Sequence, residues 1–171
     1  NAAARAKSTP ARGKRMIRLR RMTGDDVSLG MRLKDQAGWN QTEADWRRFL
    51  DLEPEGCFVA ELDGRPVGTT TTCLFDDVGW IAMVLVRERA RHRGIGTRLV
   101  ERASAYLDGR GVKTVRLDAT PLGKPVYAKM GFVVEHELVR LQGVASATAT
   151  ARAVVPVTEQ HVAGLTQLDR V

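Results

Sequence analysis

The longest apolar run of the chain, residues 80–86, is followed by a basic connector, a glycine pair and a helical pattern. Consecutive apolar residues that end in the β-branched Val86 are typical of a strand covered on both faces. From Ile95 to Leu107 apolar side chains recur every three to four residues, and Gly109 suits the end of a helix. The pattern therefore predicts a buried strand, a glycine loop and a helix.

Other segments alternate between apolar and polar residues, as half-buried strands do. Before the central strand these segments are residues 16–20, 57–62 and 66–75, with the hairpin signal Asp63-Gly64 between the last two. After the helix they are residues 113–119 and 132–141. Two strands that bracket one helix imply a right-handed crossover and parallel neighbours. We therefore expect an α+β fold with an α/β crossover and a mixed, mostly antiparallel sheet with flanking helices.

Two helices are predicted upstream of the sheet's central part. Thr23 with Asp26 and Thr42 with Asp45 have the spacing of a capping box, which places a carboxylate near the positive end of each helix. Each start is followed by apolar residues at helical spacing: Val27, Met31 and Leu33 in the first helix, and Trp46, Phe49 and Leu50 in the second.

The glycine loop has the features of a site for a pyrophosphate. The first N–H groups of a helix have no internal acceptors, and Gly94 and Gly96 let an anion approach the backbone. Arginines add positive charge around the same place: Arg91, Arg93 and Arg98. Taken alone, the Gly-x-Gly tripeptide favours a simple packing turn. A Walker loop is excluded because no Gly-Lys-Ser/Thr follows, and the dinucleotide fingerprint lacks its third glycine.

Residues 91–96, Arg-His-Arg-Gly-Ile-Gly, resemble the acyl-CoA pyrophosphate loop of the GNAT superfamily of N-acetyltransferases. That pattern is Gln/Arg-x-x-Gly-x-Gly/Ala between a buried strand and a helix. Downstream, Tyr127, Gly131 and Phe132 match the family's Tyr-x-x-x-Gly-Phe segment. The resemblance covers roughly residues 16–143, and it implies that the central strand splays from its parallel neighbour.

The resemblance implies direct transfer of an acetyl group from acetyl-CoA to a primary amine in a ternary complex, without a metal. Pantetheine would pair with the strand edge at Leu85 and Val86, and an N–H near Val86 would stabilise the oxyanion. The diphosphate would lie against the loop residues Arg91, His92, Arg93, Gly94, Gly96 and Thr97. For His92 the alternative is an exposed side chain. Tyr127 would be the general acid, since a phenol of pKa about 10 can protonate a thiolate; its alternative role is packing on the sheet.

The general base and the acceptor stay open at this stage. Residues 80–86 hold no ionisable side chain, so the base would be Asp118, Glu61 or a water chain. The acceptor pocket would be lined by Trp39, Asn40, Gln41 and Trp46, with the alternative that both tryptophans belong to the core. The leading acceptor is a small-molecule amine. The alternatives are a protein lysine or N-terminus, or a non-catalytic acyl-CoA-binding module. Members of the family often form homodimers.

The net charge, the cysteines and the apolar segments argue against several classes of protein. The net charge of +7 includes five basic residues within residues 1–15, which read as a disordered basic tail or a tag remnant, so nucleic acid is not the expected partner. Cys57 and Cys73 form neither a disulfide framework nor a metal site, and no segment resembles a membrane span, which favours the cytoplasm. Residues 16–143 would form the acetyltransferase domain. Residues 144–171 would be a C-terminal strand and helix, or the start of a second, truncated unit, because residues 157–168 echo residues 22–33.

Overall fold

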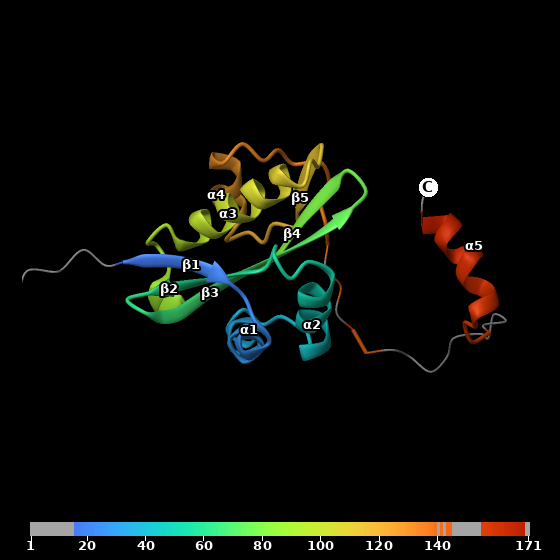
Figure 1. Ribbon diagram of the computed structural model, residues 1–171, viewed down its shortest axis with the longest axis horizontal. Coiled ribbons are helices and arrows are strands. Elements are labelled where there is room, and N and C mark those ends of the chain that lie inside the picture. Colours follow the sequence, from blue (N-terminus) through green and yellow to red (C-terminus); the bar gives the residue numbers. More distant parts are fainter. Residues whose placement is uncertain (1–15, 140, 142, 145–154, 170–171) are drawn as a thin grey trace, which may run out of the picture. The chain divides into compact units, whose positions relative to one another are not determined.

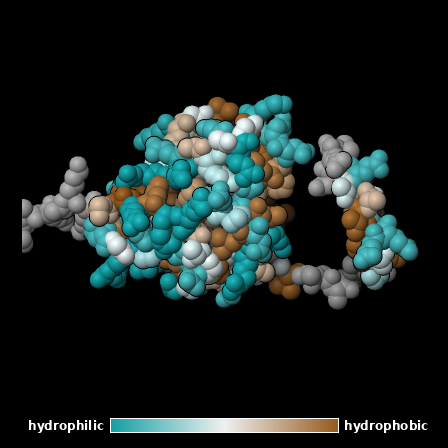
Figure 2. All heavy atoms as spheres, in the orientation of Figure 1, coloured by the Kyte–Doolittle hydropathy of each residue, from teal (hydrophilic) through white to brown (hydrophobic). Residues whose placement is uncertain are grey.

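The computed structural model describes residues 16–139, 141, 143–144 and 155–169, so the expected tail over residues 1–15 lies outside the described residues. The chain divides into two units between Val133 and Val134, and each unit is described by itself. The first unit is a five-stranded sheet with helices on both faces (Figure 1). Its surface, seen from the same side, is largely hydrophilic with hydrophobic patches between (Figure 2).

The sheet has the spatial order β1-β2-β3-β4-β5. Its strands are β1 (Ile17–Arg21), β2 (Phe58–Leu62), β3 (Arg65–Phe75), β4 (Val78–Val86) and β5 (Thr114–Leu117). Neighbouring strands are antiparallel except for β4 and β5, which are parallel. The mixed, mostly antiparallel sheet expected from the sequence is therefore confirmed.

Helices cover the two faces of this sheet. One face carries α1 (Val27–Gln36) and α2 (Glu43–Leu52), and the other carries α3 (Ile95–Gly109) with the short α4 (Lys124–Lys129) (Figure 1). The capping box at Thr42 is present, since the Thr42 N–H donates to Asp45 Oδ2 at 2.7 Å. At Thr23 the box instead opens a 3-10 turn (Gly24–Asp26), and α1 begins after that turn.

A β-bulge interrupts β4 at Met83, where φ is +51°. Thr69 pairs with Leu85 and Thr71 with Ala82, so β4 has one residue more than β3 between these pairs. As a result Ile81 packs beneath α3, whereas Met83 and Leu85 pack against α1 and α2. In an unbroken strand the three side chains would share one face.

The bulge coincides with the place where β4 and β5 separate. Their pairing begins at Val78–Thr114 and ends at Ile81–Leu117. Beyond Ile81, no strand among the described residues pairs with β4 on that side. The splayed pair implied by the resemblance is therefore present, and it leaves an open strand edge over residues 82–86.

Two details of the C-terminal part differ from expectation. The predicted strand over residues 132–141 is wrong, because residues 132–139 and 141 are not in a strand. Alternating apolar residues form a strand only beside a hydrogen-bonding partner, and here side chains such as Val133 and Leu138 are exposed. The strand expected over residues 113–119 is also shorter, at Thr114–Leu117.

The second unit contains one helix, α5 (Glu159–Asp169), within its described residues. As at Thr23, the backbone N–H of the threonine before the helix donates to the side chain three residues later. Here the Thr158 N–H donates to His161 Nδ1 at 3.0 Å. The expectation that this region begins a second acetyltransferase-like unit stays a prediction. In the described part of the chain, no helix has the length and apolar character needed to cross a membrane.

Candidate functional site

A cleft of about 580 Å³ opens where β4 and β5 diverge. Segments far apart in the sequence form its walls. They are the end of α1 with the following loop (Gln36, Ala37, Trp39), the end of β4 (Val84, Leu85, Val86), the loop and first turn of α3 (Arg91, His92, Gly94, Ile95, Gly96, Thr97), and the segment from β5 into α4 (Thr120, Pro121, Leu122, Gly123, Val126, Tyr127).

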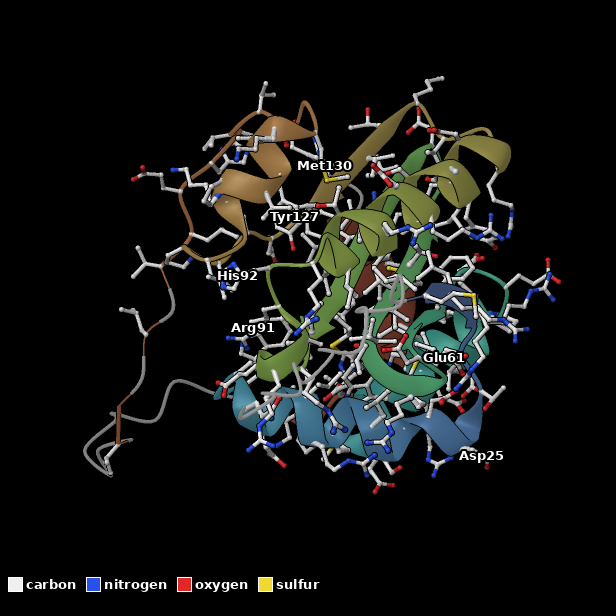
Figure 3. All side chains as sticks on the ribbon, turned by 90° about the vertical axis from the view of Figure 1, so that its left-hand side faces the viewer. Asp25, Glu61, Arg91, His92, Tyr127 and Met130 are labelled. Carbon is white, nitrogen blue, oxygen red and sulfur yellow. The ribbon has the colours of Figure 1, made fainter. Side chains whose placement is uncertain are left out.

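Of the residues expected to bind acetyl-CoA, together with the expected general acid Tyr127, all but one line this cleft. The exception is Arg93, whose guanidinium donates to the Arg89 carbonyl oxygen at 3.4 Å. Arg91, His92 and Tyr127 lie along one side of the molecule in Figure 3. Arg98, expected to add charge at the loop, donates instead to the Ile17 carbonyl oxygen at 3.3 Å.

The loop before α3 presents a row of unbonded backbone N–H groups. The first backbone hydrogen bond of the helix runs from the Arg98 N–H to Gly94 O at 3.0 Å. Within the described residues, the N–H groups of residues 92–97 donate to no backbone oxygen. His92 and Gly94 both have positive φ, at +59° and +74°, which turns the chain tightly here. Unbonded N–H groups at a helix start form a concave region of positive potential.

The two glycines of the loop differ in why glycine suits them. At Gly94 the left-handed backbone favours glycine whatever the surrounding space. At Gly96 no positive φ is present, and an added Cβ would meet only Val86 Cγ2, at 3.9 Å. The fold itself therefore tolerates a side chain at position 96, and an anion held against the backbone is what would exclude one.

The open edge of β4 ends beside this loop. The Arg87 N–H donates across the sheet to Val67 O at 2.7 Å. Because successive residues of a strand alternate in direction, the N–H and carbonyl of Val86 face the opposite edge. There the Val86 carbonyl accepts from Arg91 Nε at 3.1 Å. The Val86 N–H is thus placed to bond an extended ligand in the cleft.

Tyr127 lies on α4 and is half-buried. Its ring packs edge-to-face on Phe132, with 6.1 Å between centroids, and a Cβ at Gly123 would come within 2.7 Å of it. Burial raises the pKa of the Tyr127 phenol above its usual value. No hydrogen bond to its hydroxyl occurs among the described residues, so this hydroxyl is a proton donor open to a ligand.

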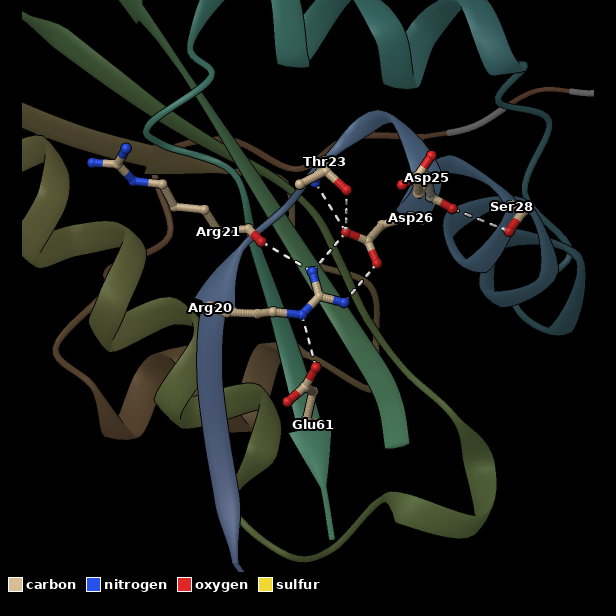
Figure 4. Close-up of polar contacts among 7 residues, drawn as sticks. All are labelled: Arg20, Arg21, Thr23, Asp25, Asp26, Ser28 and Glu61. Carbon is tan, nitrogen blue, oxygen red and sulfur yellow. Dashed lines mark hydrogen bonds and ion pairs between the residues drawn. The ribbon is translucent and has the colours of Figure 1, made fainter. Parts of the chain in front are cut away.

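Neither carboxylate considered as the general base lines the cleft. Glu61 lies on β2, where it accepts from Arg20 Nε at 2.7 Å (Figures 3 and 4). Asp118 is exposed just past the end of β5. The structure therefore does not bring either residue to Tyr127 and Val86. The place of Glu61 on β2 is explained by its ion pair with the partly buried Arg20.

The acceptor side of the cleft departs from the sequence-based expectation. Trp39 lines it, but Asn40, Gln41 and Trp46 do not. Trp46 is fully buried in the core between the sheet and α1–α2, with its indole against Gly30. Of the two interpretations given for Trp46, the structure agrees with the core residue and not with the pocket residue, because the side chain is fully buried.

Sequence reasoning missed the residues that close the cleft between β5 and α4, residues 120–123, and Gln36 with Ala37 at the end of α1. One signal was present: ligands bind beyond the carboxyl ends of parallel strands, and residues 120–123 lie shortly after β5. No comparable sequence pattern marks Gln36 and Ala37.

Metal-ligating side chains and cysteines form no reactive cluster among the described residues. They contain no group of three or more metal-ligating side chains. Both cysteines are buried, and burial raises the pKa of the Cys57 thiol to about 11, which keeps it protonated at neutral pH.

A family model described as "Acetyltransferase (GNAT) family" matches residues 28–132, the part that builds the cleft. The chain belongs to this acetyltransferase family. A holothin acyltransferase from Pseudoalteromonas sp. is 31% identical over 107 residues, which are 62% of this chain and 35% of that protein. The N-alpha-acetyltransferase MAK3 of Arabidopsis thaliana is 35% identical over 95 residues, which are 52% of this chain and 50% of that protein.

A crystal structure of a Clostridium acetobutylicum acetyltransferase with acetyl-CoA has the same fold, with a TM-score of 0.59 and 21% identity. The match covers 74% of this chain and 96% of that one. By contrast, this chain spans between 35% and 62% of the length of the curated relatives it matches.

Proposed function

We propose that this GNAT domain transfers an acetyl group from acetyl-CoA to the primary amine of a small molecule, by direct attack in a ternary complex. The observation that carries the proposal is the composition of one cleft. It combines the unbonded N–H groups before α3, the open edge of β4 at Val86 and the hydroxyl-bearing Tyr127.

The residues present fit acetyl-CoA. Unbonded N–H groups of residues 92–97 and the space at Gly96 suit a diphosphate, and the edge of β4 suits an extended amide-containing arm. The acetyltransferase from C. acetobutylicum, whose crystal structure contains acetyl-CoA, supports the same cosubstrate for this fold. Acetyl-CoA, when bound, supplies an acetyl thioester whose leaving group is a thiolate.

Two groups of the chain would act on the reacting atoms. The Val86 N–H would donate to the carbonyl oxygen as negative charge develops there, which stabilises the transition state. Tyr127 would donate its proton to the departing sulfur. Because burial raises the pKa of Tyr127, the phenol stays protonated throughout the neutral range and is ready for that role.

Two alternatives have their own support. Similarity to an N-alpha-acetyltransferase supports a peptide N-terminus as the acceptor. The lack of a carboxylate among the described residues that line the cleft supports a module that binds acyl-CoA without catalysis. A thiol-release assay over a panel of amines and peptides separates these, because a non-catalytic module binds acetyl-CoA and releases no thiol with any acceptor.

The proposed binding mode predicts the effect of a carboxylate at position 96. Gly96→Asp adds a negative side chain in open space at a helix start, where the fold tolerates it but a diphosphate is repelled. We expect acetyl-CoA affinity, measured by isothermal titration calorimetry, to fall by about 100-fold or more.

Gly24→Asp is the matched control, since Gly24 also begins a helical turn, has open space around its Cβ position and lies outside the cleft. It should bind acetyl-CoA as the unchanged chain does. Unaltered affinity in Gly96→Asp, or no binding by the unchanged chain, would refute the proposed function.

A further inference from the structure

The cleft lacks acidic side chains. None of the aspartates and glutamates in residues 16–133 lines it. The undescribed residues cannot supply one either, because residues 1–15, 140, 142, 145–154 and 170–171 contain no Asp or Glu. The remaining acids belong to the second unit, which is described separately.

Acids that come closest to the cleft in sequence have other surroundings. Asp35 precedes Gln36, but its side chain is 67% exposed and pairs with Lys34. Asp118 precedes the segment 120–123 and is exposed. The buried Glu53 accepts from Tyr106 and Arg110, away from the cleft lining.

None of the described residues that line the cleft is acidic, and the guanidinium of Arg91 is itself paired with the exposed Glu88 at 3.9 Å. Arg91 contributes a guanidinium, and the start of α3 contributes the positive end of its dipole. The rest of the wall near the acceptor side is largely apolar, with Trp39, Leu85 and Leu122. An ammonium placed there would lose water and find no carboxylate among the lining residues to pair with or to take its proton.

Building on the proposed function, we infer that the acceptor is a weakly basic amine on an apolar group, which enters the cleft already neutral. Peptide α-amines and arylamines have this chemistry, whereas alkyl ε-amines and polyamines do not. In the reaction the neutral nitrogen bonds to the acetyl carbon, the carbon–sulfur bond breaks, and Tyr127 gives its proton to the sulfur. The nitrogen then loses its extra proton to water, and the Tyr127 phenolate regains a proton from water, so no carboxylate base is needed.

The α-amine of a peptide has a pKa of about 7.7–8.0, and a lysine ε-amine has one of about 10.4. At about pH 7.5 roughly a third of the α-amine is neutral, but only about 0.1% of the ε-amine, a difference of about 250-fold. The rate constant kcat/KM for the acceptor should reflect this difference directly.

The test measures thiol release from acetyl-CoA with three acceptors: leucinamide with its free α-amine, N-acetyl-lysinamide with its free ε-amine, and an arylamine. We expect kcat/KM for the α-amine to exceed that of the ε-amine by about 100-fold or more near pH 7.5. The midpoint of the kcat/KM–pH profile should move with the acceptor's own pKa. Comparing kcat/KM for the arylamine with that for leucinamide distinguishes a small-molecule acceptor from a peptide N-terminus.

Several results would overturn the inference. They are no turnover of either weakly basic amine, an ε-amine rate within tenfold of the α-amine rate, or a midpoint that is the same with every acceptor, which would identify a group of the protein as the base. The double variants Glu135→Gln/Glu137→Gln and Glu159→Gln/Asp169→Asn together remove the acids of the second unit, and a tenfold loss with the α-amine in either would place a base there. Acetyl-CoA binding, measured separately by calorimetry, reports on the proposed function itself.

Discussion

At the scale of single residues, the environment of Tyr127 favours the protonated form of its phenol. Its phenol is packed against Phe132 and fits against Gly123, which restricts where the hydroxyl can point. Burial raises its pKa, so the proton stays in place throughout the neutral range. Packing and catalysis are therefore compatible roles for this side chain.

Tyr127→Phe keeps the ring and removes only the proton donor. We expect kcat to fall by about 10²- to 10⁴-fold while acetyl-CoA affinity stays within about twofold, measured by thiol release and calorimetry. Tyr106→Phe is the control, since the Tyr106 hydroxyl bonds Glu53 and Arg110 outside the cleft lining, and its kcat should be unchanged. Equal turnover by Tyr127→Phe at every pH would remove the acid role.

At the scale of elements, the bulge in β4 opens the cleft, and buried threonines of β3 support it. Thr69 Oγ1 donates to the Met83 carbonyl at 3.0 Å, and Thr70 Oγ1 donates to the Ala82 carbonyl at 3.4 Å. Both carbonyls belong to the irregular part of β4, where ladder bonding is disturbed. The hydroxyls therefore satisfy backbone oxygens that the bulge affects.

Two isosteric substitutions test this support. Thr69→Val removes the hydrogen bond to Met83 O in a fully buried position, and the free energy of unfolding should fall by about 1–2 kcal/mol. Thr71 is equally buried, but its hydroxyl has no partner among the described residues. Thr71→Val should therefore leave stability unchanged or raise it, because an unsatisfied buried hydroxyl is removed. Urea denaturation measures both, and equal losses would contradict this account.

At the scale of the whole molecule, a polar network ties three elements together at the sheet edge. Arg20 on β1 bonds Asp26 before α1 at 2.7 and 2.8 Å, and Glu61 on β2 at 2.7 Å (Figure 4). Burial alone would raise the pKa of the Asp26 carboxyl, but hydrogen bonds from Arg20 and Thr23 outweigh it and lower that pKa. The ionised form of Asp26 is thus the one that stabilises the fold.

Since the folded pKa of Asp26 is lowered, its stabilisation is present above the pKa of an unfolded aspartate, about 3.9, and is lost as pH falls through the folded value. Asp26→Asn should lower the free energy of unfolding by about 2 kcal/mol at neutral pH, less than for a fully buried pair because the Arg20 side chain is 29% exposed. The difference from the unchanged chain should shrink below about pH 3.

Asp25→Asn is the neighbouring control, because Asp25 is exposed and its carboxylate forms no hydrogen bond or ion pair among the described residues. It should leave the unfolding free energy unchanged at both pH values. A loss for Asp26→Asn that stays constant with pH would show that the ionised carboxylate is not the stabilising form.

The sequence by itself determined what depends on neighbours along the chain. The apolar run that became β4, the glycine loop before α3, the capping box at Thr42 and the motif over residues 91–96 are all local patterns. Strand burial, helix starts and unbonded first-turn N–H groups follow from such patterns directly, so the loop end of the cleft could be predicted.

Only the tertiary structure decided what depends on distant partners. A continuous apolar run looks the same with or without a bulge at Met83, so its two faces could not be assigned. Trp46 and Trp39 differ in burial because of what packs on them, and Glu61 is bound by an arginine about forty residues away in sequence. The lack of acidic side chains among the described residues that line the cleft is likewise a product of packing, since it arises from which side chains four separate segments bring together.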